Sequence, residues 1–217
     1  MSKIVILGAG GHARVLIEAI RTDPAHTFTG ILDPRESLQG TVVLDVPVIG
    51  ADDLLPRLQH THPCDSFVVA LGGIRQFSVR RELFATARQA DLQPLTVRHP
   101  TSECSASAEI ADGCQLLTGS VINAGARMAE NVIVNTGSIV EHDCVIGAHS
   151  HIAPRACLAG GVQVGTETHI GLGAVVRENL TIGDRVIVGA GAVVVTDVPN
   201  DSVVAGIPAR PIQGLKS

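Results

Sequence analysis

A six-residue repeat occupies residues 108–197 of this 217-residue chain and constrains its fold more than any other feature. Written in sixes from Ala108, the segment gives fifteen hexads, and the third residue of every hexad is aliphatic, counting Met128. If every second residue were aliphatic, one frame would give this result by chance roughly once in thirty thousand trials. First positions are mostly small, and Gly, Asn and Asp gather at positions four to six.

A period of six suits short strands joined by tight turns, because each strand then buries one aliphatic side chain in a shared interior. Three hexads close one triangular coil, so residues eighteen positions apart stack in ladders, and residues 108–197 make about five coils. Parallel crossovers are usually right-handed, and the periodicity alone gives no reason to expect the opposite hand. The repeat therefore predicts a parallel β-solenoid.

The N-terminal part follows a different pattern. A short apolar strand is expected at 3–7, followed by a glycine turn at 8–12 and a helix over 13–21. Further strands are expected at 29–32 and 67–71, the latter followed by Gly72-Gly73 and a helix over 74–90. Alternating strands and helices predict a mixed α/β domain, a small Rossmann-like βαβ sheet over 1–98. The solenoid and its tail then occupy 99–217, with the boundary near His99-Pro100.

Composition excludes several classes of protein. A net charge of -5 without a basic cluster argues against nucleic acid, and four Phe with no Trp or Tyr leave no base-stacking platform. The five cysteines lack C-x-x-C spacing, which argues against a disulfide framework and a zinc knuckle. The apolar run at 4–7 is too short for a signal-peptide core, and no later run suits a membrane span. We expect a cytoplasmic protein without a membrane span.

The first glycine turn satisfies a nucleotide-binding pattern. Residues 8–13, GAGGHA, match G-x-G-x-x-[GA], and Asp33 lies near the distance at which a dinucleotide fold holds a ribose. NAD(P) binding is one interpretation, although only about half of a doubly wound sheet can be counted. A tight turn without a ligand is the second. Because N–H groups at a helix N-terminus attract phosphate, a phosphorylated ligand such as a nucleotide sugar is the third.

The segment Glu141-His142-Asp143 occupies positions four to six of its hexad, where side chains face outward. An imidazole between two carboxylates gains basicity and a fixed orientation, which makes His142 a candidate general base. An ordinary corner histidine is the alternative. Gly160 lies one coil later and should stack beside His142, where its N–H either stabilises an oxyanion or only eases the turn.

Other residues of the second half leave two interpretations open. His151 falls half a coil from His142, so within one subunit it should lie on another face. One interpretation of His149, His151 and His169 is that they are ordinary polar residues of the solenoid faces. The tail at 205–210 follows the last hexad, and Pro208 cannot extend a ladder. Arg210 offers a cation there, so the tail is either a terminal cap or a phosphate contact.

Four features together carry a family resemblance: the turn GAGGHARV, the segment NTGSIVEHDCVIG, the hexads and the closing GIPAR. They resemble the sialic acid O-acetyltransferase (NeuD/PglD-like) family, and most of all its relatives that N-acetylate UDP-4-amino sugars or GDP-perosamine. The resemblance covers nearly the whole chain. It implies a left-handed β-helix, a homotrimer with active sites between subunits, acetyl-CoA as co-substrate, no metal, and a nucleotide sugar held by the N-terminal domain in surface glycan biosynthesis.

The resemblance also implies site residues by position. The catalytic corner would comprise His142 as base, Asp143 as its orienting acid, and Glu141. Asp143 stands where some relatives have Glu. In the N-terminal domain, the segment Asp33-Pro34-Arg35 does not indicate which nucleobase is bound. The substrate side would comprise Gly10, Gly11, His12, Asp33, Gly72 and Gly73, with Asp33 facing the nucleoside. The acetyl-CoA side would comprise Gly160, Gly173, Arg210, and His151 from the neighbouring subunit.

The expected reaction is therefore direct N-acetylation of a nucleotide-linked amino sugar, with three alternatives. O-acetylation of sialic acid or another sugar stays open, because His142 could deprotonate either group. A metal hydratase resembling γ-class carbonic anhydrases would need three His ligands per zinc, and the spacing of His142, His149 and His151 does not match that family. A purely structural solenoid is the third.

Overall fold

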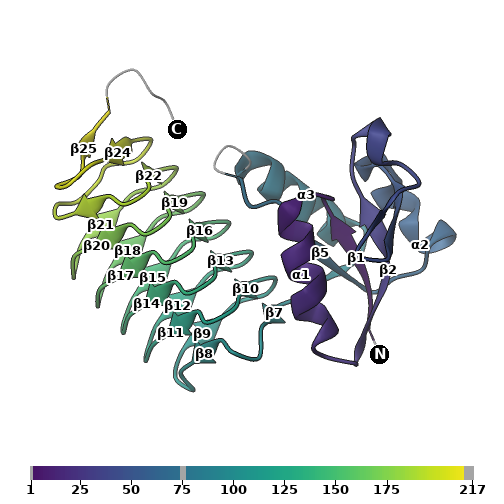
Figure 1. The fold of residues 1–217 in the computed structure, drawn as a ribbon, viewed down its shortest axis with the longest axis horizontal. Helices are drawn as coiled ribbons and strands as arrows, with labels where there is room; N and C mark the ends of the chain where they lie inside the picture. The colour runs from purple at the N-terminus through teal and green to yellow at the C-terminus, as the bar shows by residue number, and fades with distance from the viewer. Residues whose placement is uncertain (1, 74–76, 213–217) are drawn as a thin grey trace. The chain divides into compact units, whose positions relative to one another are not determined.

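The computed structural model describes residues 2–73 and 77–212 and divides the chain into two compact units, Met1–Val97 and Arg98–Ser217 (Figure 1). The division lies close to the boundary predicted at His99-Pro100. Residues 74–76, the beginning of the second predicted helix, lie outside the described residues.

The N-terminal unit is built on a six-stranded sheet with the order β3-β4-β2-β1-β5-β6. Its parallel strands are β1 (Ser2–Leu7), β2 (His26–Leu32), β4 (Val46–Gly50), β5 (Ser66–Val69) and β6 (Gln93–Pro94); β3 (Val42–Val43) is antiparallel to β4. The sequence predicted β1, β2 and β5. It missed β3 and β6 because two residues carry no period, and β4 because Pro47 interrupts its pattern.

Two longer helices pack their apolar faces on this sheet's core. Helix α1 (Gly11–Arg21) buries Leu16, Ile17 and Ile20, which recur at helical spacing. Helix α3 (Phe77–Gln89) buries Phe84, whose ring meets Phe67 of β5 edge-on at a centroid distance of 5.2 Å. Short helical segments complete the unit: η1 (Glu36–Leu38), η2 (Asp52–Arg57) and α2 (Leu58–Thr61).

The C-terminal unit is a parallel β-helix whose short strands stack coil upon coil, as Figure 1 shows. The first sheet contains β7 (Val97–Arg98), β10 (Gln115–Leu116), β13 (Ile133–Val134), β16 (His151–Ile152), β19 (His169–Ile170), β22 (Ile187–Val188), β24 (Val203–Ala205) and β25 (Arg210–Pro211). The second contains β8 (Glu103–Cys104), β11 (Val121–Ile122), β14 (Ile139–Val140), β17 (Cys157–Leu158), β20 (Val175–Val176) and β23 (Val193–Val194). The third contains β9 (Glu109–Ile110), β12 (Arg127–Met128), β15 (Val145–Ile146), β18 (Gln163–Val164) and β21 (Thr181–Ile182). This confirms the predicted Rossmann-like unit followed by a β-helix of hexapeptide repeats.

Each hexad uses its positions in the same way. Positions two and three form the strand, and the third-position side chain enters the core, as Val140, Ile152 and Leu158 do with no exposed surface. Position six turns the corner in the left-handed region, at a φ of 64° for Gly137 and 61° for Asp143. That conformation explains why Gly and Asn are frequent there.

The β-helix extends beyond the hexads read from the sequence. Strands β7 and β8 precede Ala108 and were missed, because Arg98 and Cys104 stand where an aliphatic residue was sought. At the other end the last coil is two residues shorter: His169 pairs with Ile187 eighteen positions on, but Ile187 pairs with Val203 after sixteen.

Candidate active site

The corner after β14 holds a histidine–carboxylate pair. Nδ1 of His142 lies 2.9 Å from Oδ2 of Asp143, and both side chains are well exposed, at 64% and 73%. The short Asp143 side chain reaches the neighbouring imidazole from a backbone in the left-handed conformation (φ 61°). Nε2 of His142 makes no hydrogen bond within the described part of the chain, so that nitrogen is available to take a proton.

Glu141 does not flank the imidazole as the sequence suggested. Its Oε2 accepts a hydrogen bond from Nδ2 of Asn123 at 2.9 Å and a longer one from the His142 amide at 3.4 Å. Asn123 lies one coil earlier, so Glu141 connects two coils of the corner. Among the described residues, the carboxylate that contacts the ring is that of Asp143.

Two glycines in the neighbouring coils make room for this pair. A Cβ on Gly160 would lie 2.4 Å from Cε1 and Nε2 of His142, so the ring lies directly against this glycine. A Cβ on Gly125 would lie 2.8 Å from Oδ1 of Asp143. One glycine of the preceding coil and one of the following coil therefore flank the exposed pair.

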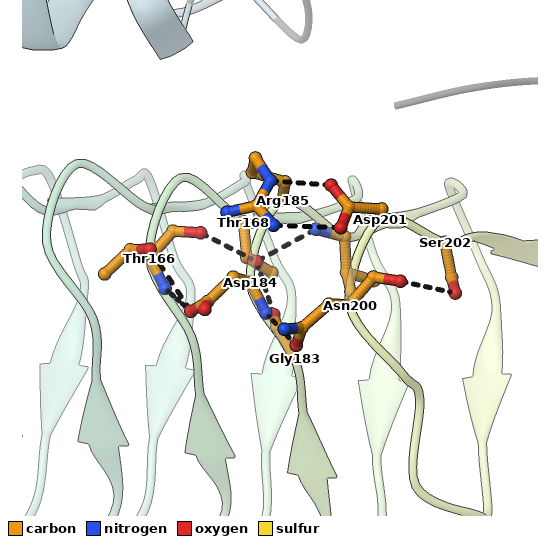
Figure 2. Close-up of polar contacts among 9 residues, drawn as sticks. Thr166, Thr168, Gly183, Asp184, Arg185, Asn200, Asp201 and Ser202 are labelled. Atoms are coloured by element: carbon orange, nitrogen blue, oxygen red, sulfur yellow. Dashed lines mark hydrogen bonds and ion pairs between the residues drawn. The ribbon is translucent and has the colours of Figure 1, made fainter.

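The amide of Gly160 is an available donor next to the imidazole. Its carbonyl accepts the Asn179 N–H at 3.0 Å, but no described residue accepts a hydrogen bond from its own N–H. The corner in Figure 2 differs, because side chains cap the equivalent amides there: the Thr166 N–H donates to Oδ1 of Asp184 at 2.8 Å, and the Asp184 N–H to Oδ1 of Asn200 at 2.9 Å. An uncapped N–H beside a base is the geometry that oxyanion stabilisation requires.

The other predicted acetyl-CoA residues lie away from this corner within one chain. His151 begins β16, in a different sheet from β14; it is buried, its Nε2 lies 2.9 Å from Nδ2 of Asn135, and its ring meets that of His169 edge-on at 5.0 Å. Gly173 turns the corner after β19 (φ 64°), and Arg210 is exposed in β25. Their part in binding acetyl-CoA remains a prediction.

In the N-terminal unit, the predicted substrate residues gather at the carboxyl ends of β1 and β5. The chain runs from β1 to β2 on one side of β1 and later places β5 on its other side, so the strand order reverses between β1 and β5. Ligands of open α/β sheets bind at such a switch point. A Cβ on Gly72 would lie 3.3 Å from Cγ of His12, so the two glycine turns meet there. Gly10 and Gly11 face open space at the beginning of α1.

Asp33 is buried just after β2 and has partners within the chain. Its side chain is only 4% exposed, and its Oδ2 accepts the Ala9 N–H at 2.8 Å, which fixes the glycine turn. Arg35 binds both carboxylate oxygens, with Nε to Oδ1 and Nη2 to Oδ2 at 2.8 Å each. The Arg35 side chain is the chief reason that the pKa of Asp33 is lowered to about 2. Asp33 therefore positions the turn and Arg35, and its contact with a nucleoside stays a prediction.

Both units of the chain resemble known proteins. Residues 3–87 match the family model of the PglD N-terminal domain. The structure of PerB from Caulobacter crescentus, in complex with CoA and GDP-perosamine, is 37% identical to this chain with a TM-score of 0.90, over 98% of both chains. This chain belongs to the PglD-like sugar acetyltransferases. The family resemblance predicted from the sequence is confirmed.

Two further solved structures are similar over the same extent. The acetyltransferase domain of PglB from Neisseria gonorrhoeae, solved with acetyl coenzyme A, is 37% identical with a TM-score of 0.86, over 97% of this chain and 99% of that one. WeeI from Acinetobacter baumannii is 28% identical with a TM-score of 0.86, over 98% of this chain and all of that one. The comparison with curated proteins found no match.

Sequence reasoning missed three residues that shape the sites of this PglD-like acetyltransferase. Asn123 and Gly125 precede Glu141 and Asp143 by one coil, so the eighteen-residue spacing could have found them. Arg80 of α3 is 1% exposed, and its Nη1 donates to the Leu71 carbonyl at 2.7 Å, just before Gly72. No sequence signal marks Arg80, because a helical arginine is normally a surface residue.

Residues 2–73 and 77–212 hold neither a metal-binding group nor a membrane-spanning helix. No three His, Cys, Asp or Glu side chains in these ranges are grouped as a metal ion would require. No helix in these ranges is both long and apolar enough to cross a membrane.

Proposed function

We propose that this protein is an acetyl-CoA-dependent N-acetyltransferase that acts on the amino group of a nucleotide-linked amino sugar. The observation that carries the proposal is the corner at His142, where Asp143 holds Nδ1 and the Gly160 N–H lies next to the ring. Among the described residues, neither Nε2 of His142 nor the Gly160 N–H has a hydrogen-bond partner. The relative from Caulobacter crescentus, similar over nearly the whole chain, was solved with CoA and GDP-perosamine.

The chemistry assigned to this corner is direct transfer. The sugar amine attacks the thioester carbonyl carbon, and Nε2 of His142 removes the amine proton as the C–N bond forms. Asp143 keeps the imidazole in the required tautomer, and the Gly160 N–H stabilises the negative charge that develops on the carbonyl oxygen. The C–S bond then breaks, and the imidazolium returns its proton to the CoA thiolate.

The N-terminal unit is assigned the nucleotide part of the substrate. Backbone N–H groups at the beginning of α1, with open space at Gly10 and Gly11, suit a diphosphate, because a helix N-terminus attracts negative charge. His12 and the second glycine turn at 72–73 border the same switch point. A free sialic acid would not use this diphosphate site, which favours the nucleotide-linked substrate over O-acetylation of a free sugar.

We assign the protein to a homotrimer with active sites at the subunit boundaries, working in the cytoplasm in surface glycan synthesis. A row of apolar side chains on the outer face of the second sheet supports association: Val121, Ile139, Cys157, Val175 and Val193 stand in register, one per coil. Val175 is 44% exposed, and the others are half-buried. An apolar row of this kind is typical of a protein–protein contact.

Release of CoA across a panel of nucleotide amino sugars, with free sialic acid as a further acceptor, tests the function. We expect turnover with at least one nucleotide amino sugar and none with sialic acid. His142→Ala should lower kcat by roughly 100-fold to 10,000-fold. His60→Ala, at an exposed histidine of α2, is the matched control. Near wild-type turnover of His142→Ala at saturating substrates would refute the assigned base.

A further inference from the structure

We propose that Arg35 reads the nucleobase of the sugar nucleotide and selects guanine. The inference rests on the proposed function, because it assumes that a nucleotide sugar binds the N-terminal unit. It concerns a residue that the sequence pattern left without a role, in the segment Asp33-Pro34-Arg35 at the carboxyl end of β2.

The guanidinium of Arg35 is held in one pose. Nε and Nη2 donate in parallel to the two oxygens of Asp33, each at 2.8 Å. Asp33 is itself fixed, because it is 4% exposed and also accepts the Ala9 N–H. Parallel bonds of an arginine to a carboxylate define the plane as well as the position of the guanidinium.

The loop that carries Arg35 is fixed as well. The Arg35 N–H donates to Oδ1 of Asp33 at 3.0 Å, and the Arg35 carbonyl accepts the Leu38 N–H at 3.0 Å. Nε2 of Gln39 donates to the Asp33 carbonyl at 2.6 Å, which closes the loop from 33 to 39. A guanidinium on such a loop is prepared for a ligand before the ligand arrives, which lowers the entropic cost of binding.

The outer edge of the guanidinium is left for a ligand. Arg35 is 56% exposed, and no described residue accepts a hydrogen bond from Nη1. With Nε and one Nη2 hydrogen engaged by Asp33, the remaining edge consists of an Nη1 hydrogen and the second Nη2 hydrogen. This edge presents two adjacent donors to solvent.

Two adjacent donors require two adjacent acceptors. Guanine supplies them as O6 and N7, the pair that arginine contacts most often in base recognition. Uracil and thymine have no such pair, because the N3–H donor separates their two carbonyls. Cytosine has N3 and O2, which makes CDP a necessary comparison. Among the GDP, UDP and dTDP sugars, only the guanine nucleotide matches the edge.

The position of Arg35 fits a base. In nucleotide-binding sheets the phosphates lie at the turn after the first strand, and the nucleoside extends over the end of the neighbouring strand. β2 is the neighbour of β1, and Asp33 links its end directly to the glycine turn through the Ala9 N–H. At the end of this strand a dinucleotide-binding fold presents an acidic side chain to the ribose. In this chain the acidic side chain, Asp33, instead holds the guanidinium of Arg35 in place.

Titration of the full-length protein with GDP, UDP, dTDP and CDP tests the inference by calorimetry, without need of catalysis. GDP should bind roughly tenfold to a hundredfold more tightly than UDP or dTDP, the range expected of one bidentate base contact. Arg35→Gln should remove this preference by weakening GDP and leaving UDP nearly unchanged. Arg35→Lys keeps the charge but not the paired donors, so it should lose the preference as well. Arg57→Gln, at an exposed arginine of the same unit, should retain it.

The outcomes separate the inference from the proposed function. If Arg35→Gln weakens GDP and UDP equally while Arg35→Lys restores both, Arg35 contacts phosphate and the inference is wrong. Equal or tighter binding of UDP, dTDP or CDP by the wild-type protein would also overturn it, whatever the enzyme acetylates. A protein that prefers GDP but releases no CoA with any nucleotide amino sugar would retain the base contact and lose the proposed function. The thermal midpoints of the variants show whether they remain folded.

Discussion

At the scale of single residues, the corner proposed to be catalytic depends on two glycines that lack a side chain. Gly125 and Gly160 lie one coil before and one coil after the His142–Asp143 pair, and each leaves a space that the pair fills. Asp143 contacts the ring from position six of its hexad, where the backbone is left-handed. The glycines at the two neighbouring corners therefore determine how the His142 and Asp143 side chains are placed.

Gly125→Ala should lower kcat much more than its effect on stability suggests. The new Cβ would lie 2.8 Å from Oδ1 of Asp143, so the carboxylate must move away from the imidazole. Gly119→Ala is a close control: both glycines have positive φ, and both donate their N–H to a hydroxyl one coil earlier, but nothing lies near a Cβ at 119. Each variant should lose about 1 kcal/mol of unfolding free energy from strain. Only Gly125→Ala should lose turnover in the CoA-release assay; equal losses in both would contradict this.

Asp33 should make stability depend on acid pH. Its folded pKa of about 2 lies below the unfolded value of 3.8, so its contribution is complete above pH 3.8 and is lost as the pH falls through 2. The shift corresponds to about 2 kcal/mol. Urea unfolding of Asp33→Asn should show that loss at pH 7 and a smaller decrease below pH 4. As a control, Asp201→Asn removes an exposed partner of Arg185 and should change the unfolding free energy little. If the unfolding free energy of Asp33→Asn fell below pH 4 as much as that of the wild type, the Asp33–Arg35 pair would not be formed.

At the scale of elements, side-chain caps hold the shortened last coil to the coils before it. Oδ1 of Asp184 accepts the Thr166 N–H and hydroxyl, and Oδ1 of Asn200 accepts the Asp184 N–H, as Figure 2 shows. The same corner carries the ion pair of Arg185 with Asp201 at 2.6 Å. These caps satisfy turn amides that the strand ladders leave without acceptors.

Asp184→Ala should lower the unfolding free energy by about 1 kcal/mol, because the Thr166 N–H loses its acceptor. Asp184→Asn keeps a carbonyl oxygen in the same place and should retain most of the stability. Urea unfolding of both variants checks this. Equal stability of Asp184→Ala and the wild type would mean that water replaces the cap without cost. Turnover should persist in both, because this corner is separate from the one that carries His142.

At the scale of the whole molecule, the apolar row on the second sheet should govern assembly. Val175→Asp places a charge in the middle of that row, and we expect the proposed trimer to dissociate, with turnover lost along with the shared active sites. Gln163→Asp, at an exposed second position of the third sheet, should leave the trimer intact. Light scattering during size-exclusion chromatography gives the mass of each. A Val175→Asp trimer would show that another face forms the contact.

The sequence by itself determined the architecture, because burial of one aliphatic residue per hexad leaves a period that no other fold explains. It also placed Gly160 beside His142, since eighteen-residue spacing stacks those positions. Only the tertiary structure decided which side chain each carboxylate contacts. Asp143 rather than Glu141 holds the imidazole, and Asp33 turns to Arg35. Side-chain direction follows from backbone φ and from neighbours distant in sequence, and neither leaves a pattern in the residue order.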